Sequence, residues 1–265
     1  MTSTSPGRLA RWYGTYGRHD LPWRRTRDRW SLLVAEVMLA QTQVPRVVAA
    51  WPVFLAQFPT PHAAAASGPG AVIEAWGRLG YPRRARRLWD AAVIIDRDGW
   101  PADLQTLPGV GRYTAGAVHA ECDDELRSIG VDVNIRRVCE RVAGDRLSEA
   151  DAERVAVRIG RPLLGRDRLL ALMDLGALVC RARDPRCGEC PLRRRCRTRG
   201  IASHERRRRV PRYEGSFRER RGAVLAALRA GSPLAATTLD GEALRSLIDD
   251  GLAAMSGGFA RLPDA

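Results

Sequence analysis

The sequence predicts an all-α fold for its first 215 residues. Apolar residues recur there at spacings of three and four, and proline or glycine separates one repeat from the next. The alternation of polar and apolar residues that marks a half-buried strand is missing from the same part. The expected helices are Gly7–Tyr16, Trp30–Val44, Val47–Phe58, Ala71–Trp76, Arg83–Arg97, Tyr113–Glu121, Ile135–Ala143, Asp151–Ile159 and Arg166–Cys180.

The last quarter of the chain differs from the rest in amino-acid composition. Residues 199–216 are rich in arginine and poor in apolar residues, which is typical of a solvated linker or of a strap that contacts phosphates. Two short helices, Arg221–Ala230 and Gly241–Leu252, and a hairpin at Gly257–Gly258 are expected beyond it. This order fits half of a winged helix or a plain helical cap. The predicted division is a core at 1–198, a basic linker at 199–216 and a small C-terminal domain at 217–265.

Composition indicates a globular protein with a polyanionic partner. Of its 265 residues, 45% are hydrophobic, and the formal net charge is +14. Basic side chains that contact phosphates release counterions, so nucleic acid fits this charge, although an anionic membrane surface fits it equally. All 44 basic side chains are arginine. Covalent catalysis through a lysine Schiff base is therefore excluded.

The N-terminal residues lack the apolar stretch of a signal peptide, and no run is long enough to span a bilayer. We therefore expect a soluble, cytoplasmic protein. In a reducing compartment, the six cysteines are metal ligands or buried thiols rather than disulfides.

Four of these cysteines form a compact motif. Cys180, Cys187, Cys190 and Cys196 are separated by six, two and five residues. Four thiolates at such spacings can converge on a tetrahedral zinc ion or on a 4Fe–4S cluster. Zinc ribbons usually present two pairs with two intervening residues, and this motif has one. The loop also carries several arginines, so a bound metal would hold a basic loop against phosphates.

The segment from Leu107 to Tyr113 reads LPGVGRY and precedes an expected helix. Two glycines one residue apart permit a tight turn whose N–H groups point outward beside a helix N-terminus. Such a turn suits a DNA phosphate, whereas a lone pair of glycines before a helix is usually only a turn.

Glu36 is the only charged residue in the apolar run from Leu32 to Ala40. A carboxyl group in that setting loses hydration, which raises its pKa and allows it to act as a general acid. A glutamate on the wet face of an amphipathic helix is the alternative interpretation.

Asp132 stands two residues before Asn134, where a helix is expected to begin. An aspartate there commonly caps the helix, and the helix N-terminus favours its ionised form. A protonated acid and an ionised carboxylate together suit cleavage of a glycosidic bond, because one protonates the leaving group and the other stabilises the developing cation.

Several strings resemble one enzyme family. LPGVGRYTAGAV is similar to the helix-hairpin-helix motif of the endonuclease III superfamily. VAEVMLAQTQV resembles the segment that carries the catalytic glutamate in adenine DNA glycosylases of the MutY type, and LPWR, LGY and the cysteine motif resemble others of the same family. The resemblance runs from about Trp12 to Cys196. It implies a two-lobed helix-hairpin-helix glycosylase fold, with the DNA cleft and the catalytic pair between the lobes and a structural 4Fe–4S cluster at 180–196.

The resemblance also implies residue roles. Glu36 would be the general acid, and Asp132 would lie beneath the sugar with Asn134 holding it. Tyr113 stands where bifunctional lyases carry lysine, so the enzyme would leave an intact abasic site. The residues expected to contact DNA or the flipped base are Trp23, Arg24, Gln41, Thr42, Leu79, Tyr81, Pro108, Gly109, Val110, Gly111 and Arg112.

The sequence departs from the family pattern in several places. Ala40 replaces a second glutamine, and Pro82 replaces the second tyrosine of the LGYY segment. Leu170 stands where many adenine glycosylases carry a glutamate or glutamine that touches adenine. The stretch 119–128 is more acidic than usual, and the family's Nudix-like C-terminal domain is not expected.

We therefore expect a monomeric, monofunctional DNA glycosylase, cytoplasmic and associated with the nucleoid. It would remove adenine paired with guanine or 8-oxoguanine in double-stranded DNA. One alternative is a thymine or uracil mismatch glycosylase of the same superfamily. Another is a DNA-binding module without catalysis, although the presence of both Glu36 and Asp132 favours an enzyme.

Overall fold

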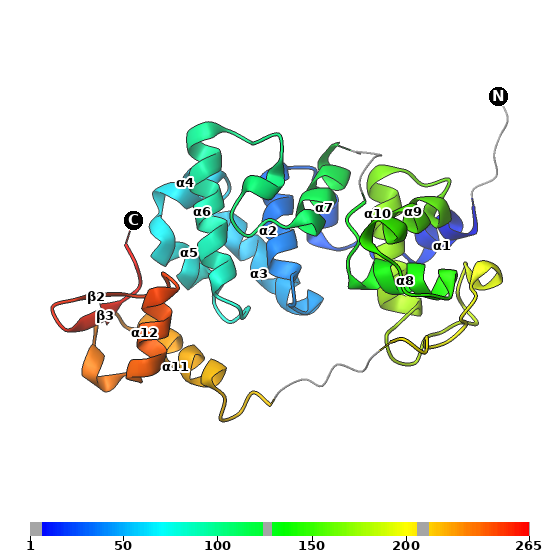
Figure 1. The fold of residues 1–265 in the computed structure, drawn as a ribbon. Coiled ribbons are helices and arrows are strands. Elements are labelled where there is room, and N and C mark those ends of the chain that lie inside the picture. The colour runs from blue at the N-terminus through cyan, green and yellow to red at the C-terminus, as the bar shows by residue number, and fades with distance from the viewer. Residues whose placement is uncertain (1–6, 124–128, 206–211, 265) are drawn as a thin grey trace. The chain divides into compact units, whose positions relative to one another are not determined.

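The computed structural model describes residues 7–123, 129–205 and 212–264, and it is mostly helical, as expected (Figure 1). The α-helices are α1 (Arg8–Tyr16), α2 (Arg29–Leu39), α3 (Val44–Gln57), α4 (Pro61–Ala66), α5 (Gly68–Trp76), α6 (Arg83–Asp98), α7 (Arg112–Asp123), α8 (Val133–Ala143), α9 (Glu149–Gly160), α10 (Gly165–Asp174), α11 (Phe217–Ala230) and α12 (Gly241–Asp249). The single 3₁₀ turns are η1 (Pro22–Arg25), η2 (Leu104–Thr106), η4 (Arg193–Arg195) and η5 (Ala236–Thr238), and η3 (Leu175–Val179) is a π-helical turn. The strands are β1 (Leu234–Ala235), β2 (Ala254–Ser256) and β3 (Phe259–Arg261).

The chain forms two compact units. The first combines 1–33 with 111–208, and the second combines 34–110 with 209–265. The expected boundaries at 198 and 217 divide the chain differently, since the C-terminal segment belongs to the same unit as 34–110. A separate domain at 217–265 stays a prediction. Within the expected basic linker, residues 206–211 lie outside the described residues.

In the first unit, α10 is the central helix and packs against α1, α7, α8 and α9 (Figure 1). The apolar core between these helices includes Leu9, Ile135, Val138, Leu172 and Leu192. Short polar residues define where the helices begin: the Ser148 hydroxyl accepts a hydrogen bond from the Asp151 N–H at the start of α9.

In the second unit, α4 and α5 pack on α6, and α11 packs on α12. Two arginines join the C-terminal segment to the earlier residues of this unit. Arg229 on α11 donates to the carbonyl oxygens of Ile73 and Gly77, at 2.9 and 2.7 Å. Arg86 on α6 donates to the Gly251 carbonyl oxygen at 3.0 Å. These contacts explain why 209–265 groups with 34–110.

The C-terminal segment contains a small antiparallel sheet in the order β1-β3-β2. Ser256 pairs with Phe259, which leaves Gly257 and Gly258 as the turn between β2 and β3. Both glycines have positive φ, 57° and 80°, as a two-residue hairpin turn requires. The hairpin expected at these glycines is confirmed.

The helix expected from Trp30 to Val44 is shorter than expected at its C-terminal end. The helix α2 ends at Leu39, and α3 begins at Val44. The physical reason is Pro45, which has no N–H to donate and whose ring would clash with the preceding turn of a continuous helix. Between the two helices the chain reverses through Gln41, whose φ is +61°.

The helix expected at Arg166–Cys180 is not α-helical over its whole length. The α-helical part ends at Asp174, and the chain continues as the π-turn η3. A Cβ on Gly176 would lie 2.7 Å from the Cβ of Asn134. Only glycine therefore allows this turn to lie directly against α8.

Asp174, at the end of α10, is a fully buried carboxylate that anchors the segment before α2. Arg24 forms two hydrogen bonds with it, at 2.6 and 2.8 Å, and Arg18 contributes two more, from its Nε at 2.6 Å and from its backbone N–H at 2.9 Å. Burial raises the pKa of Asp174, but the hydrogen bonds and charges of the two arginines lower it more, so that its pKa is below the usual value.

We expect Asp174→Asn to lower the free energy of unfolding at pH 7 by about 3–5 kcal/mol, because buried arginines lose their counter-charge. Since the folded-state pKa of Asp174 is lowered, its contribution is present above the unfolded pKa of about 4 and is lost as pH falls through the folded value. Urea denaturation of both proteins from pH 7 downward measures this. Asp98→Asn, which removes an exposed pair with Arg97, is the control. Equal stability of the wild type and Asp174→Asn at pH 7 would contradict the prediction.

Candidate active site

The expected hairpin turn follows η2. The Val110 N–H donates to the Leu107 carbonyl oxygen at 3.1 Å, and Gly109 has a φ of +78°. The Ala115 N–H bonds to the Gly111 carbonyl oxygen as α7 begins, which leaves the N–H groups of the preceding residues without partners inside the helix. The backbone from Pro108 to Gly111 therefore has the shape expected of a phosphate-binding turn.

The side chain of Arg112, directly after this turn, is engaged within the first unit. It pairs with Glu153 at 2.8 Å and with Glu149 at 3.5 Å. Arg112 is more than half exposed, so water screens both pairs and either can exchange for a phosphate. Its predicted role on DNA stays a prediction.

Glu36 lies in the middle of α2 and is 4% exposed. Its neighbours Leu33 and Ala35 are fully buried, and Val37 is 8% exposed. The alternative of a glutamate on a wet helix face is therefore wrong: this carboxyl group is removed from bulk water. Such an environment favours the protonated form of a carboxyl group.

Asp132 is the N-cap of α8, as expected. Its Oδ1 accepts hydrogen bonds from the N–H groups of Asn134 and Ile135, at 2.9 and 2.7 Å. Its Oδ2 accepts a hydrogen bond from the Asn134 side-chain amide at 2.7 Å. Burial raises the pKa of Asp132, these hydrogen bonds lower it, and the pKa remains above its ordinary value. The geometry holds one carboxylate with three N–H donors.

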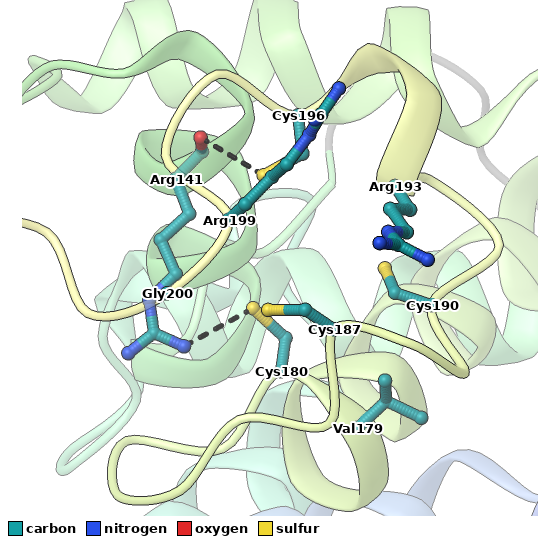
Figure 2. A pocket seen from close by; sticks show the side chains of 9 residues that line it. All are labelled: Arg141, Val179, Cys180, Cys187, Cys190, Arg193, Cys196, Arg199 and Gly200. Atoms are coloured by element: carbon teal, nitrogen blue, oxygen red, sulfur yellow. Dashed lines mark hydrogen bonds between the residues drawn. The ribbon is translucent and has the colours of Figure 1, made fainter.

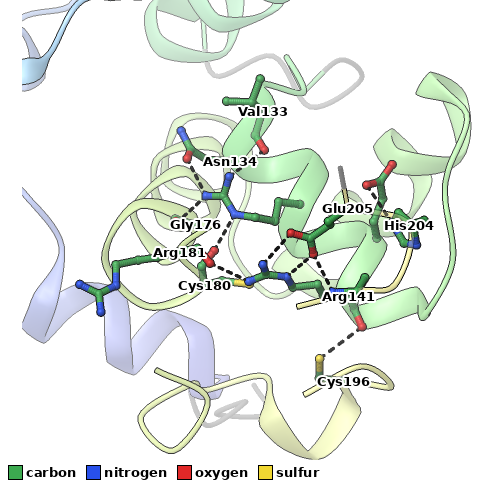
Figure 3. A network of polar contacts seen from close by, with 12 residues as sticks. Val133, Asn134, Arg141, Gly176, Cys180, Arg181, Cys196, His204 and Glu205 are labelled. Atoms are coloured by element: carbon green, nitrogen blue, oxygen red, sulfur yellow. Dashed lines mark hydrogen bonds and ion pairs between the residues drawn. The ribbon is translucent and has the colours of Figure 1, made fainter. Parts of the chain in front are cut away.

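Arg137, one turn further along α8, connects this carboxylate with the cysteine motif. Its Nη2 donates to the Asn134 side-chain oxygen and to the Gly176 carbonyl oxygen, both at 2.8 Å, and its Nε donates to the Cys180 carbonyl oxygen at 2.7 Å. Asn134, Gly176 and Cys180 lie close together in Figure 3. Sequence reasoning missed Arg137, because nothing in its pattern separates it from the many other arginines.

The four cysteines of the motif line one pocket, together with Arg141, Arg193 and Arg199 (Figure 2). Cysteine thiols are the donor type of both an iron–sulfur cluster and a zinc ion, so the chemistry of this lining suits either group. Among the described residues, however, no three His, Cys, Asp or Glu side chains are arranged to hold a single metal ion.

Arg141 supports this pocket from within α8 and is 1% exposed. It donates to the Cys180 sulfur at 3.5 Å and to the Arg181 carbonyl oxygen at 2.8 Å, and its own carbonyl oxygen lies 3.3 Å from the Cys196 sulfur (Figure 3). Glu205 binds the other edge of its guanidinium group through two hydrogen bonds of 2.6 and 2.7 Å. The pocket therefore has a charged, fully hydrogen-bonded support.

Trp23 and Arg24 lie in η1, in the first unit. Trp23 is 3% exposed, and the Arg24 side chain is held by Asp174. Arg166 on α10 donates to the Arg24 carbonyl oxygen at 2.8 Å, which fixes the backbone of this turn. The roles of Trp23 and Arg24 at a flipped base stay predictions.

In the second unit the structure brings two predicted DNA-contacting segments together. The Thr42 hydroxyl donates to the Leu79 carbonyl oxygen at 3.2 Å. Gln41 and Tyr81 are exposed, whereas Leu79 is buried. Both exposed residues have positive φ, +61° and +50°, an unfavourable backbone shape for residues other than glycine.

Tyr113, at the start of α7, is half-buried, and its hydroxyl lies 3.8 Å from the Met173 sulfur. Leu170 is 4% exposed and belongs to the apolar core of the first unit.

No helix in the described part of the chain has the length and apolar character needed to cross a membrane.

Comparison with known proteins places this geometry in context. Residues 34–159 match the model of the HhH-GPD superfamily of base excision DNA repair proteins. The chain is 43% identical over 274 residues to an adenine DNA glycosylase of Mycolicibacterium smegmatis, covering 94% of this chain and 92% of the relative. It is 34% identical over 206 residues to a thymine-DNA glycosylase of Aeropyrum pernix, covering 71% and 91%. A solved structure of a thermostable thymine-DNA glycosylase superimposes with a TM-score of 0.65 at 26% identity, covering 72% and 93%.

The chain thus belongs to the adenine DNA glycosylase family, within the helix-hairpin-helix enzymes of base excision repair. The resemblance found in the sequence motifs is confirmed.

The capping geometry of Asp132 generates a stability prediction. Asp132→Ala should lower the free energy of unfolding by about 1 kcal/mol through loss of the cap, and Asp132→Asn should lose less. Because burial raises the folded-state pKa of Asp132, its contribution is full below the unfolded pKa of about 4 and is lost as pH rises through the folded value. The deficit of the asparagine variant should therefore shrink between pH 4 and pH 7 in urea denaturation. A deficit that grows with pH would contradict this.

Proposed function

We propose that this chain is a monofunctional adenine DNA glycosylase, which removes adenine paired with guanine or 8-oxoguanine in duplex DNA. One observation carries the proposal: a chain of this family holds one carboxyl group buried in an apolar helix, Glu36, and a second as a hydrogen-bonded helix cap, Asp132. These are the two chemical states that hydrolysis of an N-glycosidic bond requires.

The reaction divides between the two carboxyl groups. Glu36 acts as the general acid and gives its proton to a ring nitrogen of the flipped base. The bond between C1′ and the base then breaks, and the electron pair leaves with the neutral base. Asp132 stabilises the positive charge that develops on the sugar. Water adds to C1′ and returns a proton to Glu36, which leaves an abasic site and restores the acid.

The absence of lysine supports a monofunctional enzyme. A lyase step needs an amine that forms a Schiff base with C1′, and Tyr113 stands where bifunctional relatives carry that lysine. The chain should therefore act on mismatched duplex DNA without cutting the strand, and we propose that it does so as a monomer. The backbone turn Pro108–Gly111 would bind a phosphate, and Gln41 and Tyr81 would contact the opened base pair.

A second candidate, excision of thymine or uracil from mismatches with guanine, has specific support. Leu170 is an apolar core residue where many adenine glycosylases carry a polar side chain that touches adenine. The Aeropyrum pernix relative is named a thymine-DNA glycosylase. A pocket without a polar partner for the purine would fit this substrate equally.

Single-turnover excision on labelled duplexes separates these candidates. We expect release of adenine from A·8-oxoguanine and A·G, with little release from T·G or U·G, and strand cleavage only after hot alkali. Cleavage without alkali would contradict the monofunctional proposal. Release of thymine or uracil alone would establish the second candidate, and no release from any duplex would leave a DNA-binding module.

In the same assay, Asp132→Asn and Glu36→Gln should each reduce the rate by at least about a hundredfold, because each removes a charge or proton that acts only in the transition state. Duplex binding should remain within about twofold of wild type, since neither carboxyl group attracts phosphate. Asp98→Asn, an exposed acidic position on α6, serves as the control. Undiminished turnover in either variant would remove that residue from the mechanism.

We further propose that Cys180, Cys187, Cys190 and Cys196 hold a 4Fe–4S cluster with a structural role. When bound, such a cluster would cross-link the loop and place its arginines for phosphate contact. Iron and acid-labile sulfide should each be about four per chain, with broad visible absorbance. Cys190→Ser should lower both and lower thermal stability, whereas Cys122→Ser, outside the motif, should not. Stoichiometric zinc in anaerobically purified protein would contradict the cluster.

A further inference from the structure

Arg84 on α6 stands out among the described residues of the second unit, because its guanidinium group joins two separate loops. Nη1 donates to the carbonyl oxygens of Val37 and Met38, at 2.7 and 3.2 Å, and to that of Ala40. Nη2 donates to the Thr42 hydroxyl at 3.1 Å and to the Gly80 carbonyl oxygen at 3.2 Å. One side chain therefore binds the end of α2, the turn after it and the loop before α6.

Among the described residues of this unit, the two non-glycine residues with positive φ, Gln41 and Tyr81, lie in the segments that Arg84 holds. Gln41 lies between Ala40 and Thr42, and both of these bind Arg84. Tyr81 follows Gly80, which also binds Arg84. A residue other than glycine keeps a positive φ only where its surroundings enforce it. The contacts of Arg84 with flanking residues supply that enforcement for both positions.

The setting of Arg84 makes these contacts durable. Its guanidinium carbon lies 5.4 Å from the centre of the Trp76 ring and 5.2 Å from that of Tyr81. The Trp76 ring N–H donates to the same Gly80 carbonyl oxygen at 2.9 Å. Burial lowers the pKa of Arg84 to about 10, which still leaves it charged at neutral pH. In the described part of the chain its charge faces carbonyl oxygens at the negative end of α2 rather than a carboxylate.

We infer that Arg84 is a positioning residue that sets Gln41 and Tyr81 in the backbone conformations they use on DNA. The inference rests on the proposed function, in which these two exposed residues contact the opened base pair. Arg84 itself would touch neither the base nor the sugar. Its effect would pass through the two loops, and also through the last turn of α2, which carries Glu36.

The planar fork of arginine is essential to this role. The two terminal amino groups of Arg84, held in one plane, reach acceptors on both loops at once, whereas the ammonium group of lysine is a compact point charge. Arg84→Lys keeps the charge and most of the side-chain volume but cannot bridge the same set of acceptors. It is therefore the informative variant.

The chain offers a matched control in Arg229. This arginine is also partly buried in the second unit and also donates to two carbonyl oxygens, those of Ile73 and Gly77, at the end of α5. Arg229→Lys should cost comparable stability, and its contacts lie at the end of α5 rather than on the residues that flank Gln41 and Tyr81. A difference in exchange or excision rate between the two variants then reflects where the arginine lies, because both variants lose similar packing.

The first measurement is hydrogen exchange on the free, full-length protein. The Ala40 and Thr42 amides, bonded to the carbonyl oxygens of Glu36 and Leu39, report on the turn. In Arg84→Lys their exchange should speed up about tenfold or more, and in Arg229→Lys it should not change. Unchanged exchange in Arg84→Lys would overturn the inference. If that variant does not fold, Thr42→Val removes one Arg84 contact from the loop side and should speed exchange at Ala40.

The second measurement is single-turnover excision and the fluorescence of 2-aminopurine placed beside an A·8-oxoguanine pair. Arg84→Lys should lower the rate about tenfold to a hundredfold, with reduced fluorescence from unstacked bases and unchanged affinity for undamaged duplex. Faster exchange with wild-type excision and fluorescence would overturn the positioning role. If the wild-type protein releases no adenine, the proposed function fails, and the exchange data alone decide whether Arg84 holds the loops.

Discussion

The guanidinium group held by backbone carbonyl oxygens is the interaction on which most of this structure depends. In the first unit Arg137, Arg141 and Arg166 each donate to carbonyl oxygens outside their own turn of helix. In the second, Arg84 and Arg229 do the same. A buried charge is costly unless hydrogen bonds compensate it, and the planar fork forms several at once, although the Nε atoms of Arg84 and Arg229 are left without a partner among the described residues. In a chain without lysine, arginine therefore serves as an internal cross-link as well as a surface charge.

These cross-links occur where regular structure ends. Irregular backbone lacks the repeating hydrogen bonds of a helix, so its carbonyl oxygens need other donors. Three of the segments expected to contact DNA or the base are of this kind: the turn η1, the reversal at Gln41 and the loop at Tyr81. Each is fixed by an arginine from a neighbouring helix. Rigid positioning of exposed residues is what a transition state demands of its surroundings.

Much of this architecture could be predicted from local pattern. Helical periodicity and helix caps such as Asp132 act within a few residues, so they are visible in the sequence. The break between α2 and α3 was placed a few residues too late, because the apolar pattern continues to Val44, although Pro45 signals the interruption. The helix α4 was missed as well, although Thr60 and Pro61 form a typical helix start. Arg84, Arg137 and Asp174 could not be found, because their partners lie far away in the sequence and they resemble every other charged residue locally.

The buried contact of Gly176 with Asn134 and the exposed loop residues Gln41 and Tyr81 differ in how readily they can be substituted. Gly176 allows the turn after α10 to lie against Asn134, which holds Asp132, and no larger residue fits there without moving α8. A larger residue at position 176 would therefore need compensating changes in α8. Gln41 and Tyr81 face solvent, and their side chains can change without disturbing a core. New mismatch preferences within this lineage would therefore arise at the exposed loops, while the glycine at 176 marks the boundary of what selection can alter one residue at a time.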